Sequence, residues 1–257
     1  MAHNVKYFLV PETDSTNLEV ARRVAALPEA ERAGCDCFVA SADFQTAGRG
    51  QRCNRWVAER GSNLLFSVLL YPEGVTAARQ FVVSQAMSVA VCRAFCSLGS
   101  GFGVKWPNDI YYGDRKLCGT IIETTLRGGN VDRCILGVGI NVNQETFGDE
   151  APNPTSLRLV LGHEVDRTAL LHSVVDGFLD TLRLVADGAA DQVAAAYRSM
   201  LIRREGTHRY RDAEGDFEAS LLDVEPDGHL VLRDTQGRVR RYMFKEVRHL
   251  FGTLERE

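Results

Sequence analysis

The chain has 257 residues, of which 45% are apolar and 25% charged, and its formal net charge is −4. These values are typical of a soluble globular protein with one large or two small domains, and the acidic balance argues against a general nucleic-acid binder. Because no apolar run reaches the length of a membrane-spanning helix or a signal peptide, we expect a cytoplasmic protein with no membrane partner. The seven cysteines have neither zinc-site nor Cys-x-x-Cys spacing, which predicts reduced thiols.

Apolar periodicity in the first half of the chain predicts strands at residues 5–10, 37–42 and 63–70 and helices at 16–27 and 77–98. The stretch from Phe44 to Trp56 follows neither the helical nor the strand period. It contains Gly48-Arg49-Gly50 and further arginines at positions 52 and 55. Since glycines let the backbone approach a ligand and arginines bind phosphate or carboxylate, the stretch predicts an anion site. A solvated basic loop is the alternative.

The second half of the chain predicts strands at residues 116–123 and 134–142 and helices at 167–185 and 191–201. From about residue 204, short alternating segments separated by glycine-containing turns predict a small antiparallel β-barrel or sandwich. We therefore predict an α/β (α+β) protein with a catalytic domain at residues 1–203 and a small β-barrel domain at residues 204–257. Glu123 lies in a predicted buried strand, where we expect a satisfied polar group.

Five polar clusters fall at the ends of predicted strands or helices: Ser15-Thr16-Asn17, Gln45–Trp56, Lys105–Asp109, Lys116 with Gly119, and Gly139–Asn143. Their glycines, arginines, lysines and aspartate could neutralise phosphates and hold a magnesium ion. This predicts nucleotide chemistry, although neither a Walker sequence nor a complete dinucleotide fingerprint is present. The first cluster is equally explained as the N-cap of a helix, with Thr16 and Glu19 forming a capping box.

In this order and spacing the motifs resemble those of the biotin protein ligases, over residues 8–145. The matching segments are Ser15-Thr16-Asn17, Gln45-Thr46-Ala47-Gly48-Arg49-Gly50, Trp56, Lys105-Trp106-Pro107-Asn108-Asp109, Arg115-Lys116-Leu117-Cys118-Gly119 and Gly137-Val138-Gly139-Ile140-Asn141. The resemblance implies a mixed central β-sheet flanked by helices, the catalytic fold shared with class II aminoacyl-tRNA synthetases, plus the small C-terminal barrel. It also implies the ligase-only type, with no DNA-binding domain and no DNA partner, as a monomer or homodimer.

The resemblance implies a reaction in two steps. Biotin and ATP, with Mg²⁺, give biotinyl-5'-AMP, and the biotin then passes to a lysine of a biotin carboxyl carrier protein domain of a biotin-dependent carboxylase. By similarity the catalytic residues are Lys116, Arg49, Arg52 and Asp109. Those expected to bind biotin are Ser15, Thr16, Asn17, Gln45, Gly48, Arg49, Gly50, Lys116 and Gly119. Those expected to bind ATP are Arg52, Asn54, Trp56, Lys105, Asn108 and Asn141. Asp109 is a candidate magnesium ligand or, alternatively, the acceptor of the incoming lysine's proton.

The loop departs from better-known members of this family at three positions. Gln51 stands where arginine is frequent, Cys53 where glycine is common, and Asn54 where some members have arginine. The roles of these positions therefore stay open. Two other functions also remain: a lipoate or octanoyl ligase of related fold, and a nucleotide- or RNA-binding module without catalysis.

Overall fold

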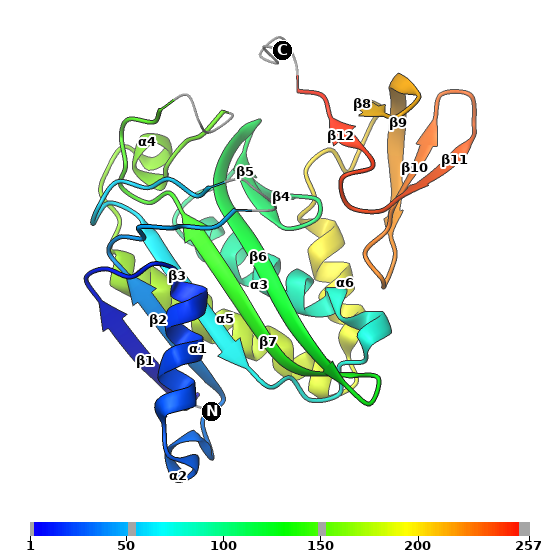
Figure 1. Cartoon of the computed structure of the whole chain (residues 1–257). Helices are drawn as coiled ribbons and strands as arrows, with labels where there is room; N and C mark the ends of the chain where they lie inside the picture. Colours follow the sequence, from blue (N-terminus) through cyan, green and yellow to red (C-terminus); the bar gives the residue numbers. More distant parts are fainter. Residues whose placement is uncertain (1–2, 51–54, 149–152, 252–257) are drawn as a thin grey trace.

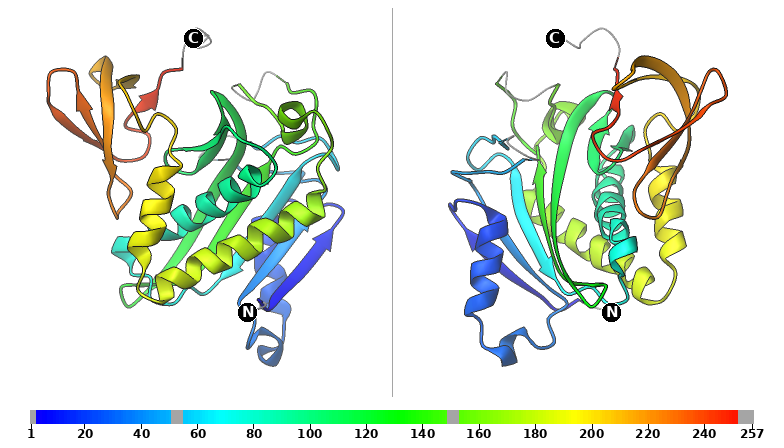
Figure 2. Two further views of the ribbon diagram at one scale, coloured as in Figure 1. Left: turned by 180° about the vertical axis from the view of Figure 1, so that it is seen from behind. Right: turned by 45° about the vertical axis from the view of Figure 1, so that its right-hand side comes forward.

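A computed structural model describes residues 3–50, 55–148 and 153–251. It contains a seven-stranded sheet with helices on both faces and a second, five-stranded sheet formed by the end of the chain (Figures 1 and 2). Four loop positions discussed above, Gln51, Arg52, Cys53 and Asn54, lie outside the described residues. No helix among the described residues is long and apolar enough to cross a membrane.

The seven-stranded sheet has the order β1-β2-β3-β7-β6-β5-β4. Only β1 and β2 among these neighbours run parallel, so the sheet is mixed, as predicted. The strand bounds are β1 Val5–Val10, β2 Cys37–Ala42, β3 Leu64–Leu70, β4 Phe102–Lys105, β5 Asp109–Tyr112, β6 Arg115–Arg127 and β7 Asn130–Ile140. β6 and β7 form a longer hairpin than the sequence predicted, and the short strands β4 and β5 were not predicted as strands.

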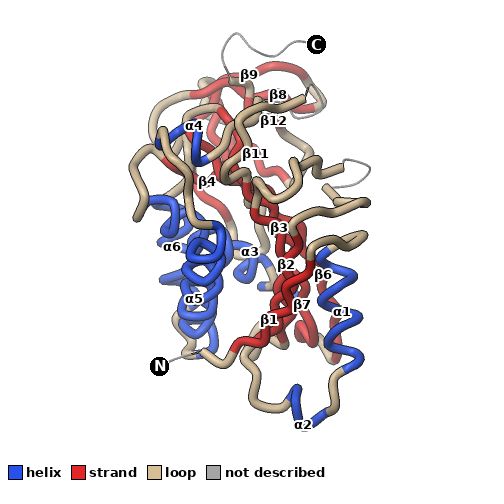
Figure 3. Tube along the Cα trace, turned by 90° about the vertical axis from the view of Figure 1, so that its left-hand side faces the viewer, coloured by secondary structure: helices blue, strands red, loops and turns tan. Residues whose placement is uncertain are grey.

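Helices cover both faces of this sheet (Figure 3). Helix α1 lies alone on one face, and α3, α5 and α6 lie on the other. Alternating residues of β3 serve the two faces: Leu69 packs with Val20 and Val24 of α1, whereas Phe66 and Val68 join the core below α3 and α5. The helical bounds are α1 Thr16–Ala26, α2 Glu29–Arg32, the 3₁₀ turn Ala77–Arg79, α3 Phe81–Cys96, α4 Leu157–Leu161, α5 Arg167–Ala186 and α6 Ala190–Ser199.

The second sheet is antiparallel, with the order β11-β10-β9-β8-β12, which confirms the predicted all-β character of this region. Its strands are β8 His208–Asp212, β9 Gly215–Val224, β10 Leu230–Asp234, β11 Val239–Tyr242 and β12 Arg248–His249. Aromatic residues link this region to the first sheet: Trp106 donates from Nε1 to the Gly228 carbonyl at 2.9 Å, and Tyr111 stacks on Phe251. The proposed boundary at residues 203/204 stays a prediction.

Candidate active site

Three glycines hollow the face of the large sheet that carries α1. Residues directly opposite one another in neighbouring strands point to the same face. Ile135 of β7 packs with α1, so that face also carries the β7 residues at alternate positions, Gly137 and Gly139. Gly119 of β6 pairs with Gly139 and completes the set. The missing side chains leave a shallow depression between the N-terminus of α1 and the strands β6 and β7.

Two side chains from other elements fill this depression. A Cβ on Gly137 would overlap Oδ1 of Asn17, and one on Gly139 would lie 2.5 Å from Cε2 of Trp56. A Cβ on Gly119 would lie 2.9 Å from Cζ3 of the same tryptophan. Real Cβ atoms do not approach other atoms so closely, so glycine is required here for packing. Trp56, expected to bind ATP, and Gly119, expected to bind biotin, are therefore in contact.

A buried serine, Ser67, ties the predicted biotin-binding residues together. Its hydroxyl lies 2.7 Å from Oγ1 of Thr16 and 2.6 Å from Oδ1 of Asn17, two acceptors that share its single proton. Oε1 of Gln45 in turn accepts from the Thr16 backbone amide at 2.8 Å. Sequence analysis missed Ser67, although a lone hydroxyl in the apolar run of β3 was the available signal. Thr16, Asn17 and Gln45 are thus brought together as predicted.

Ser15 begins α1 as its N-cap residue, but its hydroxyl makes no capping hydrogen bond to the described helix. The expected capping box between Thr16 and Glu19 is wrong, because the N-cap is Ser15 and Glu19 accepts from Arg22, Arg23 and the Thr13 hydroxyl. Simple capping therefore does not explain the serine hydroxyl. Ser15 is only 3% exposed and lies next to Thr16, at the edge of the same polar group.

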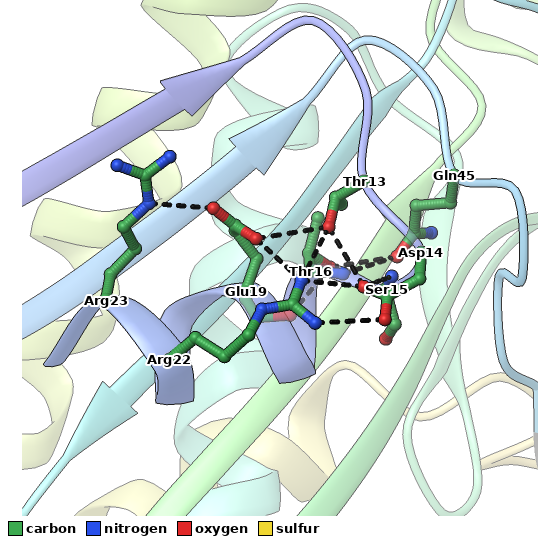
Figure 4. A network of polar contacts seen from close by, with 9 residues as sticks. Thr13, Asp14, Ser15, Thr16, Glu19, Arg22, Arg23 and Gln45 are labelled. Atoms are coloured by element: carbon green, nitrogen blue, oxygen red, sulfur yellow. Dashed lines mark hydrogen bonds and ion pairs between the residues drawn. The ribbon is translucent and has the colours of Figure 1, made fainter. Parts of the chain in front are cut away.

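An arginine from the second turn of α1 holds the segment before the helix (Figure 4). Nη2 of Arg22 donates to Oδ1 of Asp14 at 2.8 Å and to Oε2 of Glu19 at 2.7 Å. Asp14 also accepts the backbone amide of Ser15 at 2.7 Å. The hydrogen bond from Arg22, followed by that from the Ser15 amide, holds the pKa of Asp14 well below its ordinary value. The pKa of Glu19 is lowered by hydrogen bonds from Arg22 and Arg23.

The cationic residues of the site each face a carboxylate. Nζ of Lys116 lies 2.7 Å from Oδ2 of Asp109, and Nη2 of Arg49 lies 3.2 Å from Oε1 of Glu123. The arginine loop returns to the sheet where the Trp56 amide donates to the Gly48 carbonyl at 3.1 Å. Glu123 is a satisfied polar group as expected, through Asn17 and Arg49, but it is about half exposed and not buried. The outer part of β6 lacks a β5 neighbour beyond Cys118, which leaves this carboxylate accessible.

A cavity of about 560 Å³ lies along the open edge of β6. Its walls are Arg49 and Gly50, the 107–108 turn, β6 residues 120–124, the start of α3, and residues 227–229 and 243–245 of the second sheet. Oδ1 of Asn108 is buried and has no hydrogen-bond partner among the described residues. Since buried polar atoms are normally satisfied, this acceptor is available to a bound molecule.

Three described residues that were predicted to bind the nucleotide lie outside the walls of this cavity: Trp56, which packs against Gly119 and Gly139, Lys105 and Asn141. Nζ of Lys105 lies over the rings of Tyr111 and Phe251, 5.1 and 5.5 Å from their centroids. The side-chain amide of Asn141 donates to the Thr155 carbonyl at 3.0 Å and is already engaged. The arrangement therefore brings Arg49, Gly50 and Asn108 to one cavity, while Lys105 and Asn141 lie apart from it.

Comparison with known proteins agrees with this geometry. The profile of the biotin/lipoate A/B protein ligase family matches residues 36–141. The chain is 28% identical over 205 residues to the bifunctional ligase/repressor BirA of Bacillus spizizenii, covering 78% of this chain and 63% of that protein. It is 29% identical over 244 residues to the biotin--[acetyl-CoA-carboxylase] ligase of Paracoccus denitrificans, covering 90% of this chain and 95% of the relative.

The solved biotin protein ligase from Aquifex aeolicus, in complex with biotin and ATP, superimposes with a TM-score of 0.76 at 23% identity. The alignment covers 95% of this chain and 99% of that one. The fold is thus that of an α/β protein ligase with a small C-terminal sheet. Over residues 36–141 the chain is similar to the biotin/lipoate A/B protein ligase family, and over most of its length it is similar to a biotin--[acetyl-CoA-carboxylase] ligase.

Proposed function

We propose that this chain is a biotin protein ligase. It condenses biotin with ATP to biotinyl-5'-AMP and transfers the biotin to a lysine of a biotin carboxyl carrier domain. The observation that carries the proposal is that buried hydroxyl and amide side chains and two cationic side chains lie on the same face of the sheet. Thr16, Gln45 and Ser67 supply the first group, and Arg49 and Lys116 supply the second.

The polar group favours biotin over an apolar acyl chain. A ureido ring offers two N–H donors and one carbonyl acceptor, and it needs partners of both kinds. Hydroxyls donate and accept, and a glutamine amide does both as well. A lipoyl or octanoyl chain has no ureido ring and could make no hydrogen bonds with Thr16, Gln45 and Ser67, which are bonded to one another in this structure. This contrast separates the proposal from the related lipoate ligases.

The first chemical step is opposed by repulsion between two anions. An oxygen of the biotin carboxylate attacks the α-phosphorus of ATP, and the bond from that phosphorus to the pyrophosphate oxygen breaks. Lys116, whose Nζ lies beside Gly119, offsets the negative charge that gathers on the pentacoordinate phosphorus, and Arg49 binds the biotin carboxylate from the ground state onward. Asn108 and Gly50 line the adjoining cavity, where we place the nucleotide.

The second step forms an amide bond. The neutral ε-amine of the carrier lysine attacks the acyl carbon, the bond to the phosphate oxygen breaks, and AMP leaves with the electron pair. Asp109 is the carboxylate placed to take the surplus proton, through its contact with Lys116. A phosphate-bound magnesium ion takes only one or two carboxylates from a protein, so Asp109 also fits the ion that accompanies ATP.

The test is biotin-dependent exchange of radiolabelled pyrophosphate into ATP by the purified full chain. We expect exchange with biotin and none with lipoate or octanoate. A carrier domain with its acceptor lysine should then be labelled, and the same domain with that lysine changed to arginine should not. Exchange that depends on lipoate instead would assign the related ligase, and RNA binding without any exchange would remove the enzyme class.

A further inference from the structure

Glu123 joins the two halves of the proposed site through one carboxylate oxygen. Its Oε1 accepts from Nδ2 of Asn17 at 2.9 Å and lies 3.2 Å from Nη2 of Arg49. Asn17 belongs to the start of α1 and Arg49 to the glycine-flanked loop, so β6 links two segments that are far apart in the sequence. Glu123 also lines the cavity along the edge of β6.

The first of these contacts is fixed by the surrounding packing. Asn17 is only 2% exposed, and its side chain occupies the space left by Gly137. Its Oδ1 accepts from the Ser67 hydroxyl at 2.6 Å. Because a carboxylate can only accept hydrogen bonds, the Nδ2 group of Asn17 must face Glu123. The carboxylate of Glu123 is therefore held on one side by a buried and oriented donor.

The second contact is exchangeable. The side chains of Arg49 and Glu123 are 43% and 47% exposed, and ion pairs of such exposure contribute only about 0–1 kcal/mol. A guanidinium carries five N–H donors, so one that meets a carboxylate through Nη2 retains donors for a second anion. Glu123 can hence direct the guanidinium without using up its capacity to bind.

We propose that Glu123 is a positioning residue that holds Arg49 over the sheet, oriented to receive the anionic group of the ligand. This inference rests on the proposed function for the identity of that anion, the biotin carboxylate and then the acyl phosphate. In the absence of ligand, Glu123 keeps the loop start at Gly48–Gly50 next to β6. When the ligand binds, Arg49 contacts both Glu123 and the ligand.

The test is Glu123→Gln, which preserves the length of the side chain and an acceptor for Asn17 but removes the negative charge. We expect the KM for biotin to rise about fivefold with kcat within twofold of the wild type, because Arg49 binds ground state and transition state alike. In an Arg49→Ala background the same substitution should change KM by less than twofold, as coupled residues are not additive.

A matched control is Asp132→Asn, which removes a carboxylate paired with Arg127 at the far end of the same hairpin. It should leave KM and kcat unchanged. An unchanged KM in Glu123→Gln, or an equal effect with and without Arg49, would overturn the proposal. Thermal unfolding of all variants shows whether a changed KM is caused by a loss of folding.

Hydrogen exchange in the absence of ligand tests the positioning without any activity. The amides of residues 48–50 should exchange several-fold faster in Glu123→Gln than in the wild type and in Asp132→Asn. Equal exchange would overturn the proposed positioning even in an active enzyme. If the wild type catalysed no biotin-dependent exchange, the proposed function would fail, while faster amide exchange would still support the link between Glu123 and Arg49.

Discussion

The polar and the cationic side chains of the site are held in different ways. Thr16, Asn17 and Ser67 are at most 3% exposed and are bonded to one another. Lys116 and Arg49 are about a quarter and two fifths exposed, and each faces one carboxylate. The part of the site that would recognise a neutral ring is thus built into the core, whereas the part that would meet charge stays near solvent.

Desolvation explains this difference. A buried hydroxyl or amide is tolerated once its hydrogen bonds are made, but a buried charge costs far more unless it is well paired. A cation that must also bind a ligand anion cannot be locked in a dry core. We therefore expect substitutions of the cations to reduce the chemistry with little loss of stability, and substitutions in the buried group to reduce stability first.

The largest effect is expected for Lys116→Ala. Loss of the ammonium removes a charge-assisted contact to the reacting groups, which should lower the rate of adenylate formation about a hundredfold. Rapid-quench measurement of biotinyl-5'-AMP checks this, with unfolding free energy measured alongside. Lys6→Ala is the control, because it also breaks a pair between a lysine and a carboxylate: Lys6 of the outer strand β1 is paired with Glu31. A rate within threefold of the wild type would remove Lys116 from the chemistry.

A substitution next to the buried polar side chains should lower the stability of the fold before it lowers the rate of the reaction. Gly137→Ala places a methyl group against the Asn17 amide, which cannot move without breaking its bonds to Ser67 and Glu123. We expect the free energy of unfolding to fall by about 2 kcal/mol, as in other overpacked cores. Denaturant titration measures this. Gly148→Ala, where an added Cβ meets no atom within 4 Å, should change stability by less than about 0.5 kcal/mol.

Part of the site and of the fold could be predicted from the sequence. The family motifs named Thr16 and Gln45, which the structure brings into contact, and Lys116 and Asp109, which the structure pairs; their roles in binding and catalysis stay predictions. The all-β end of the chain followed from the alternating segments and turn signals, and the mixed sheet followed from the family resemblance. These features are local, because each depends on residues that are adjacent in the sequence or belong to one known motif.

The remaining features depend on register between distant strands, which a single sequence does not specify. Ser67 reaches the site only because its face of β3 is the one next to α1, and a shift by one residue would turn it away. Glu123 belongs to the site because β5 leaves β6 after Cys118. The separation of Lys105 from the cavity results from packing against Phe251, more than 140 positions later in the chain.

A smaller effect on biotin binding is expected for Arg22, which holds the segment just before α1 through the polar contacts shown in Figure 4. Arg22→Gln removes the donor that holds Asp14 and thereby loosens the backbone amide of Ser15. The KM for biotin should rise about threefold, since exposed ion pairs each contribute only about 0–1 kcal/mol, while the KM for ATP should not change. Arg23→Gln is the matched control, because Arg23 contacts Glu19 alone in this network. Equal effects of the two substitutions would contradict the assignment of this role to Arg22.

The smallest effect is a change in the pH dependence of stability. Arg22 lowers the pKa of Asp14 and of Glu19 in the folded chain. Carboxylates with a lowered pKa stabilise the folded state above their unfolded pKa of about 4, and this contribution is lost as the pH falls through the folded pKa. The gap in unfolding free energy between the wild type and Arg22→Gln should therefore be largest near neutral pH and should shrink on acidification. Urea titrations at pH 7 and pH 3 measure the gap, and a gap that stays constant would show that Arg22 stabilises the helix start by packing and not by charge.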